Sequence, residues 1–282
     1  ERIRAEVLAP VAEKAGAVLV TLGADGKGTL ADAADAASPD FATVPRQADD
    51  LAALLYTSGT TGRSKGAMLT HGNLVSNTHA LREAWRYDAS DVLIHALPIF
   101  HTHGLFVATN VTLFSGASMI FLPKFDVDRI FELMGRATVL MGVPTFYVRL
   151  LQDDMLTAGN TRHMRLFVSG SAPLLAETHR EWQARTGHAI LERYGMTETN
   201  MNASNPYDGD RVAGTVGMPL PGVQIIVTDP ETGAELPQGE IGMIEVRGPN
   251  VFKGYWQMPE KTAAELRPNG FFITGDLGRS EE

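Results

Sequence analysis

The chain has 282 residues, 44% of them hydrophobic and 20% charged, so it is long enough to bury a large core in one or two domains. Its formal net charge of −9 argues against a nucleic-acid partner, which would need a basic face. The absence of cysteine excludes disulfides and a cysteine nucleophile, and it fits a cytosolic protein. No apolar run approaches the roughly 20 residues of a membrane span, so we expect no membrane association.

Apolar residues at helical spacing predict a helix over residues 2–15, and an apolar run predicts a strand over 17–22. The run 51–55 predicts a buried strand, and 67–70 predicts a short second strand. Predicted helices and strands then alternate: helix 73–85, capped by Asn73, strand 92–97, helix 103–114, strand 118–122, helix 126–136, strand 138–142, helix 145–156, strand 165–169, helix 174–186 and strand 189–194. This alternation predicts an α/β fold, a layered and largely parallel sheet flanked by helices.

The character of the sequence changes after residue 210. Short apolar runs at 223–228, 243–246 and 271–274 are separated by Gly and Pro turns, which predicts a smaller β-rich subdomain. We therefore expect an α/β region over residues 1–210 and a β-rich subdomain over 211–282.

A loop rich in glycine and hydroxyl groups joins the strands predicted at 51–55 and 67–70. It reads Thr57-Ser58-Gly59-Thr60-Thr61-Gly62-Arg63-Ser64-Lys65-Gly66. Glycines let the backbone approach a ligand closely, while hydroxyls, free N–H groups and Lys65 can bind phosphate oxygens. The spacing differs from that of a Walker A loop, which needs a lysine directly after a glycine and before a helix. A polyphosphate site and a plain flexible hairpin both fit this composition.

Three later motifs carry groups suited to a nucleotide. Ser169-Gly170-Ser171-Ala172 ends a predicted strand, and Glu192-Arg193-Tyr194-Gly195-Met196-Thr197-Glu198 and Thr274-Gly275-Asp276 end two others. Tyr194 offers an apolar face to a base, and Thr197 can donate to a phosphate. Glu198 is a hard oxygen ligand for Mg²⁺, and Asp276 can accept from both ribose hydroxyls. Taken singly, the glycine turns could also be structural, Tyr194 could be core, and Glu198 could be a solvated carboxylate.

In this order the motifs resemble those of the adenylate-forming enzymes, which include acyl-CoA synthetases, luciferases and the adenylation domains of peptide synthetases. The resemblance implies that ATP binds to Thr57, Ser58, Gly59, Thr60, Thr61, Gly62, Lys65, Gly170, Ser171, Ala172, Arg193, Tyr194, Gly195, Met196, Thr197 and Asp276. It also implies catalytic roles for Lys65, Thr197 and Glu198, with Mg²⁺ on Glu198.

Two stretches point to an acid substrate, residues 97–104 with His101 and residues 142–149 with Arg149. In the family these stretches border the acyl pocket. A histidine and an arginine facing that pocket would recognise a second carboxylate, although Arg149 could instead extend to solvent. His95, His101 and His103 match no metal motif. With Ser169 and Met196 as further candidates, the pattern resembles that of malonyl-CoA synthetases, which implies a short dicarboxylic acid, with malonate as the expected substrate.

The resemblance implies a two-step reaction: the acid forms an acyl-adenylate with ATP, and coenzyme A then displaces AMP. The family also has an earlier N-terminal part and a C-terminal lid domain with an essential lysine, neither of which we find in this sequence, so we expect the chain alone to be poorly active. The alternatives are a ligase for another short or medium-chain acid, a nucleotide-binding module without catalysis, and a P-loop hydrolase.

Overall fold

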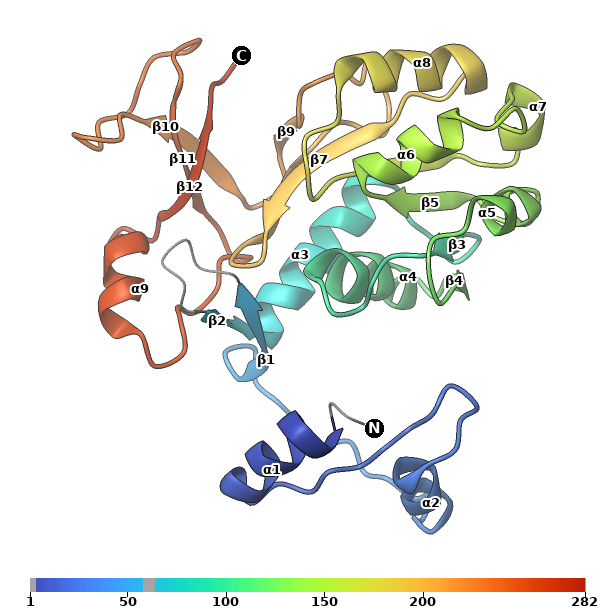
Figure 1. The fold of residues 1–282 in the computed structure, drawn as a ribbon. Coiled ribbons are helices and arrows are strands. Elements are labelled where there is room, and N and C mark those ends of the chain that lie inside the picture. The colour runs from blue at the N-terminus through green and yellow to red at the C-terminus, as the bar shows by residue number, and fades with distance from the viewer. Residues whose placement is uncertain (1–3, 58–63, 282) are drawn as a thin grey trace. The chain divides into compact units, whose positions relative to one another are not determined.

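The computed structural model describes residues 4–57 and 64–281, which divide into two compact units, Glu1–Pro45 and Arg46–Glu282 (Figure 1). The described part of the first unit contains a π-helical turn η1 (Arg4–Leu8) and the helices α1 (Ala9–Ala15) and α2 (Thr29–Asp35). The strand predicted at 17–22 is wrong. Val18 is 89% exposed, and the described part of this unit has no second strand with which the segment could pair.

A seven-stranded sheet forms the centre of the second unit (Figure 1). Its spatial order is β4 (Ser118–Phe121), β3 (Val92–His95), β5 (Val139–Gly142), β6 (Leu166–Ser169), β7 (Leu191–Met196), β8 (Asn200–Ser204) and β9 (Met218–Pro219). Neighbouring strands are parallel from β4 to β7, and β8 and β9 continue the sheet antiparallel. The predicted α/β fold with a largely parallel sheet is confirmed.

Two helical layers cover the faces of this sheet. One face packs against α3 (His71–Ala84), η2 (His103–Thr109) and α4 (Asn110–Phe114), and the other against α5 (Val127–Met134), α6 (Pro144–Leu151), α7 (Ala158–Thr161) and α8 (Ala176–Thr186). Alternate strand residues serve the two faces: Val139 and Met141 belong to the first core, and Leu140 between them belongs to the second. Because both faces are covered, β5 and the first three residues of β3 and of β6 are apolar.

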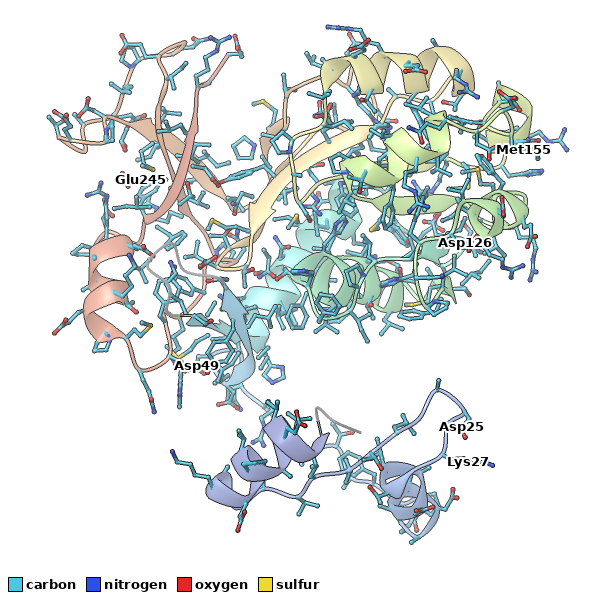
Figure 2. All side chains as sticks on the ribbon, viewed as in Figure 1. Asp25, Lys27, Asp49, Asp126, Met155 and Glu245 are labelled. Atoms are coloured by element: carbon cyan, nitrogen blue, oxygen red, sulfur yellow. The ribbon has the colours of Figure 1, made fainter. Side chains whose placement is uncertain are left out.

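Two smaller sheets complete the second unit. β1 (Leu51–Thr57) and β2 (Lys65–Thr70) form an antiparallel hairpin, and β10 (Gln224–Thr228), β11 (Gly242–Arg247) and β12 (Phe272–Gly278) form a three-stranded antiparallel sheet. Glu245 of β11, labelled in Figure 2, is buried and accepts hydrogen bonds from Arg267 and Thr228. The three-stranded sheet confirms the β-rich character predicted after residue 210. The exact boundary at 210 stays a prediction, since β9 lies beyond it and pairs with β8.

Two local predictions differ from the structure, and one helix of the structure has no predicted counterpart. Helix α3 begins at His71 with Thr70 as its cap, and Asn73 is the reciprocal partner of Thr70 in a capping box. β1 is largely exposed rather than buried, because one face of the hairpin is open. Helix α9 (Pro259–Glu265) lacks apolar periodicity and was not predicted. Among the described residues, no helix is long and apolar enough to cross a bilayer.

Candidate active site

The hairpin of β1 and β2 holds the two ends of the candidate phosphate loop. Thr57 pairs with Lys65 across the hairpin. The loop residues predicted to bind ATP between them, Ser58, Gly59, Thr60, Thr61 and Gly62, lie outside the described residues. Within the described chain, the Thr57 hydroxyl is buried and has no hydrogen-bond partner. A buried hydroxyl at the start of such a loop can donate to a loop group or to a phosphate oxygen.

Lys65 lies in a small charged cluster at the end of this loop. Its ammonium donates to the Tyr255 hydroxyl at 3.1 Å and lies 4.6 Å from the centre of that ring. The ammonium is also 3.5 Å from the carboxylate of Glu265, on α9. The cluster therefore joins the phosphate loop to the segment between β11 and β12.

Glu198 reaches the same cluster from the large sheet. It lies in the tight turn between β7 and β8, next to Thr197, and is only 3% exposed. Its Oε1 is 2.9 Å from the Tyr255 hydroxyl, so Lys65 and Glu198 contact the same hydroxyl group. Mg²⁺ at a polyphosphate site needs only one or two carboxylates, because phosphates and waters complete its shell. A hard carboxylate oxygen beside the phosphate-loop lysine fits that requirement, although no group of three or more candidate ligands occurs among the described residues.

The residues predicted to hold the nucleoside also meet. The hydroxyl of Tyr194, on β7, donates to Oδ2 of Asp276, on β12, at 2.6 Å. Burial and the Asp276 carboxylate both raise the pKa of Tyr194, so its hydroxyl keeps its proton. This bond joins the large sheet to the three-stranded sheet, which stands beside the end of β7 (Figure 1). Gly195 follows at a point where a side chain would collide with the Asn200 carbonyl.

Arg193 is the buried cation of the site. Its side chain is only 4% exposed and packs against Gly170, where an added Cβ would lie 2.3 Å from the guanidinium carbon. Burial lowers its pKa to about 10. Within the described chain, its guanidinium makes one hydrogen bond, a long contact of 3.5 Å to the Ser171 hydroxyl. Nε has no hydrogen-bond partner in the described chain, and no ion pair of Arg193 occurs there.

His103 completes this polar group. Its Nδ1 lies 3.2 Å from the hydroxyl of Ser171. Ser171 is an exposed residue, and its backbone φ is 70°. Burial lowers the pKa of His103 well below its usual value, and the nearby charge of Arg193 lowers it further. The imidazole is therefore neutral at pH 7. Ala172 follows Ser171 on the surface of the turn.

The residues predicted to bind the acid are not gathered in one place. Ser169, whose buried hydroxyl has no partner in the described residues, ends β6 near the Arg193 group, and Met196 is half-buried at the end of β7. His101 is exposed and contacts Phe100. Arg149 is exposed and lies over the ring of Phe125.

The face of helix α6 explains the position of Arg149. Tyr147 points inward, where its hydroxyl donates to the Val168 carbonyl. Residues two apart on a helix point in nearly opposite directions, so Arg149 points outward. The roles of His101 and Arg149 in acid binding stay predictions. His103 and Tyr255 had no predicted role; in both cases the signal was a polar side chain inside a buried segment.

The chain belongs to the family of AMP-binding enzymes, whose model matches residues 2–256. The predicted resemblance to adenylate-forming enzymes is confirmed. The chain is 42% identical over 254 residues to a malonate–CoA ligase of Arabidopsis thaliana, covering 83% of this chain and 41% of the relative. A mitochondrial malonate–CoA ligase of Mus musculus is 40% identical over 259 residues, covering 80% and 44%.

A crystal structure of ATP-bound MatB from Rhodopseudomonas palustris shares the fold, with a TM-score of 0.96 and 71% sequence identity, over 99% of this chain and 56% of that one. The chain thus spans about half the length of the relatives it matches.

Proposed function

We propose that the protein containing this chain is an AMP-forming acid–CoA ligase that activates a short dicarboxylic acid, malonate first. One observation carries the substrate class: Arg193 is buried beside an exposed hydroxyl and has no carboxylate partner in the described chain. A buried cation without a partner is costly, and a ligand carboxylate removes that cost with two charge-assisted hydrogen bonds. A monocarboxylic acid would leave Arg193 unpaired once its only carboxylate had reacted.

The substrate then lies between two groups of residues. Its distal carboxylate binds to Arg193, with Ser171 as a second donor and neutral His103 as the acceptor that orients the Ser171 hydroxyl. The proximal carboxylate attacks the α-phosphorus of ATP, and pyrophosphate leaves. The thiol of coenzyme A then attacks the acyl carbon, and AMP leaves. The malonate–CoA ligases among the relatives support this choice of acid.

Other residues position the nucleotide. Tyr194 provides a face for the adenine, Asp276 accepts from the ribose, and Thr197 donates to the α-phosphate. Lys65 neutralises phosphate charge, and Glu198 holds Mg²⁺, which supplies charge neutralisation for the leaving pyrophosphate. In this proposal the other residues predicted to bind ATP, apart from Arg193 and Ser171, keep that role. We also propose a cytosolic location for this protein, although one of its relatives is mitochondrial.

The test is pyrophosphate release by the full-length protein with ATP, Mg²⁺ and a panel of acetate, malonate, methylmalonate, succinate and octanoate. We expect malonate to be preferred, and Arg193→Met to lower kcat/KM for malonate by about 100-fold or more while changing acetate little. Arg149→Met is the matched comparison, and we expect about a 2-fold change or less. A loss with Arg149→Met but not with Arg193→Met would place the distal carboxylate on α6. If no acid gives pyrophosphate, the protein is a nucleotide-binding module without ligase activity.

A further inference from the structure

Tyr255 lies between the charged residues that a polyphosphate would contact. Its hydroxyl accepts from Lys65 at 3.1 Å and lies 2.9 Å from Glu198 and 2.7 Å from Glu265. A phenol has one hydrogen to donate, so this hydroxyl can serve only one of the two carboxylates at a time. The three charged residues are therefore organised around a single neutral group.

The position of this hydroxyl is set by the fold. The ring is 2% exposed and packs edge-on against Phe252 at 4.8 Å. The backbone on either side is tied down as well: Tyr255 N donates to Thr262 Oγ1 at 2.9 Å, and Trp256 N donates to the Gly66 carbonyl at 2.7 Å. The Gly66 bond and the bridge between Tyr255 and Ala67 tie the backbone that carries the ring to the strand that begins with Lys65.

We propose that Tyr255 is a positioning residue for nucleotide binding, whose hydroxyl holds the Lys65 ammonium and the Glu198 carboxylate apart and facing one polyphosphate. The inference rests on the proposed function, which assigns Lys65 to the phosphates and Glu198 to Mg²⁺. The Lys65 ammonium and the Glu198 carboxylate both contact this hydroxyl. Without it, these opposite charges would approach each other and form an ion pair. That pair would compete with the phosphates for Lys65 and with Mg²⁺ for Glu198.

Glu265 provides the alternative acceptor that this role needs. Its other oxygen pairs with Lys261 at 2.6 Å, one turn earlier on α9, so its charge is compensated whether or not Tyr255 donates to it. When Glu198 binds Mg²⁺, the Tyr255 hydrogen turns to Glu265, and the Tyr255 oxygen keeps its bond from Lys65 until phosphate replaces it.

The test compares two buried tyrosines in the full-length protein. Tyr255→Phe keeps the ring, its packing and the cation–π contact, and removes only the hydroxyl. Tyr87→Phe is the matched control, because Tyr87 is also 2% exposed and its hydroxyl, 3.3 Å from Thr112, lies in a purely structural contact. The measurements are ATP affinity by calorimetry with and without Mg²⁺, kcat for malonate-dependent pyrophosphate release, and thermal stability.

We expect Tyr255→Phe to reduce the gain in ATP affinity that Mg²⁺ confers, and to lower kcat by about 10-fold or more. Its thermal stability should match that of Tyr87→Phe, whose ATP affinity and kcat should equal the wild type. Unchanged Mg²⁺-dependent affinity and kcat in Tyr255→Phe would overturn the proposal, as would a loss no larger than the one in Tyr87→Phe. If the wild type releases pyrophosphate with no acid, the ligase assignment is wrong, and the Mg²⁺-dependent affinities still decide the role of Tyr255.

Discussion

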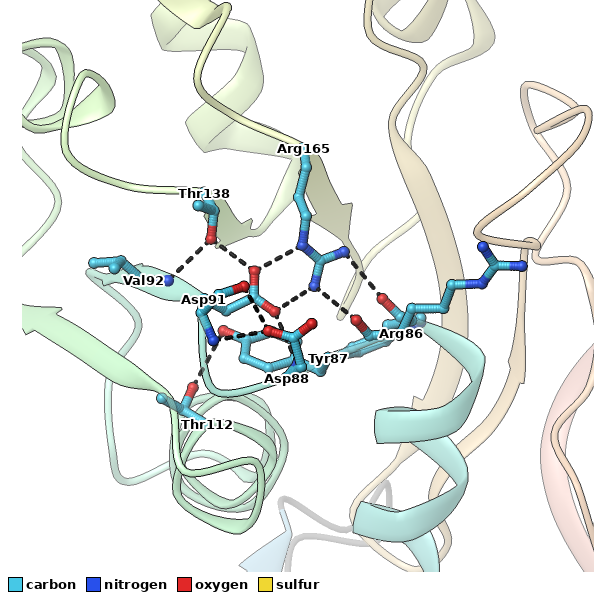
Figure 3. Close-up of polar contacts among 10 residues, drawn as sticks. Arg86, Tyr87, Asp88, Asp91, Val92, Thr112, Thr138 and Arg165 are labelled. Atoms are coloured by element: carbon cyan, nitrogen blue, oxygen red, sulfur yellow. Dashed lines mark hydrogen bonds and ion pairs between the residues drawn. The ribbon is translucent and has the colours of Figure 1, made fainter.

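Two arginines beside the large sheet have opposite surroundings. Arg165, just before β6, donates to both carboxylate oxygens of Asp91 and to the carbonyls of Trp85 and Arg86 (Figure 3). Arg193, on β7, has only the long contact to Ser171. Burial lowers the pKa of both, but in Arg165 the bonds to Asp91 outweigh burial and raise the pKa, whereas in Arg193 burial prevails.

The comparison separates a structural charge from a binding charge. The Arg165 group ties the end of α3, the start of β3 and the start of β6 into one network, since Asp91 also accepts from Thr138 and from the Asp88 backbone. Such a network resists change because every charge is compensated inside it. Arg193 has no such counter-charge in the described chain, so its charge is available to a ligand. The predictions below test this contrast, from the largest expected effect to the smallest.

Asp91→Asn should be the most damaging change to the fold. It removes a carboxylate that is only 1% exposed and leaves Arg165 without its counter-charge, which should lower the free energy of unfolding by about 3 kcal/mol. Urea denaturation of the full-length protein measures it. The control is Asp88→Asn, whose side chain is exposed and should matter much less. Equal effects of the two substitutions would show that the Arg165 network contributes little to stability.

Replacing each arginine by methionine should shift stability in opposite directions. Arg165→Met should destabilise the protein by about 2 kcal/mol, because Asp91 then stays buried and unpaired. Arg193→Met should leave stability unchanged or raise it by about 1 kcal/mol, because an unpaired buried charge is replaced by a flexible apolar chain. Thermal unfolding without ligand compares the two variants. A large loss in Arg193→Met would mean that the arginine supports the fold rather than a ligand.

The sequence predicted the fold well for a physical reason. Strands that are covered on both faces are rich in apolar residues, and the helices between them are amphipathic. The two kinds of element can therefore be told apart from the pattern of apolar residues. The prediction failed where an apolar run has no strand to pair with and where a helix is too polar to show periodicity. The run 17–22 had no partner strand, and α9 has a surface too polar to show periodicity.

The site was predictable only in part. Motif order identified Tyr194 and Asp276, which meet in the structure although they are far apart in the sequence. The direction of side chains was not predictable. Neighbours on a strand point to opposite faces, so a motif that names Arg193 and Tyr194 together does not say how each side chain meets a ligand. Likewise, of these two neighbouring histidines the buried one is His103, the first residue of η2, whereas His101 precedes that helix and is exposed.

Ser171 should show a trade between strain and binding. Its φ of 70° favours glycine, so Ser171→Gly should be more stable than Ser171→Ala by about 1 kcal/mol. Both variants lose the hydroxyl between Arg193 and His103, so both should lower kcat/KM for malonate by about 10-fold. Thermal unfolding measures the difference in stability, and pyrophosphate release measures the change in kcat/KM. If the glycine variant keeps full activity, the turn geometry matters and the hydroxyl does not.

The smallest expected effect is a pH dependence from His103, which faces Arg193, His95 and the Ser171 hydroxyl. Its folded pKa lies well below the ordinary 6.5, so the folded state holds the imidazole neutral while the unfolded chain can protonate it. Its contribution is therefore complete above pH 6.5 and is lost as the pH falls below that value. Between pH 7.5 and 6.0 the wild type should lose about 0.8 kcal/mol more than His103→Gln does. Urea denaturation of the wild type and of His103→Gln at both pH values measures this difference. An identical pH dependence in His103→Gln would mean that burial and the nearby charge of Arg193 do not lower the pKa of His103 in the folded state.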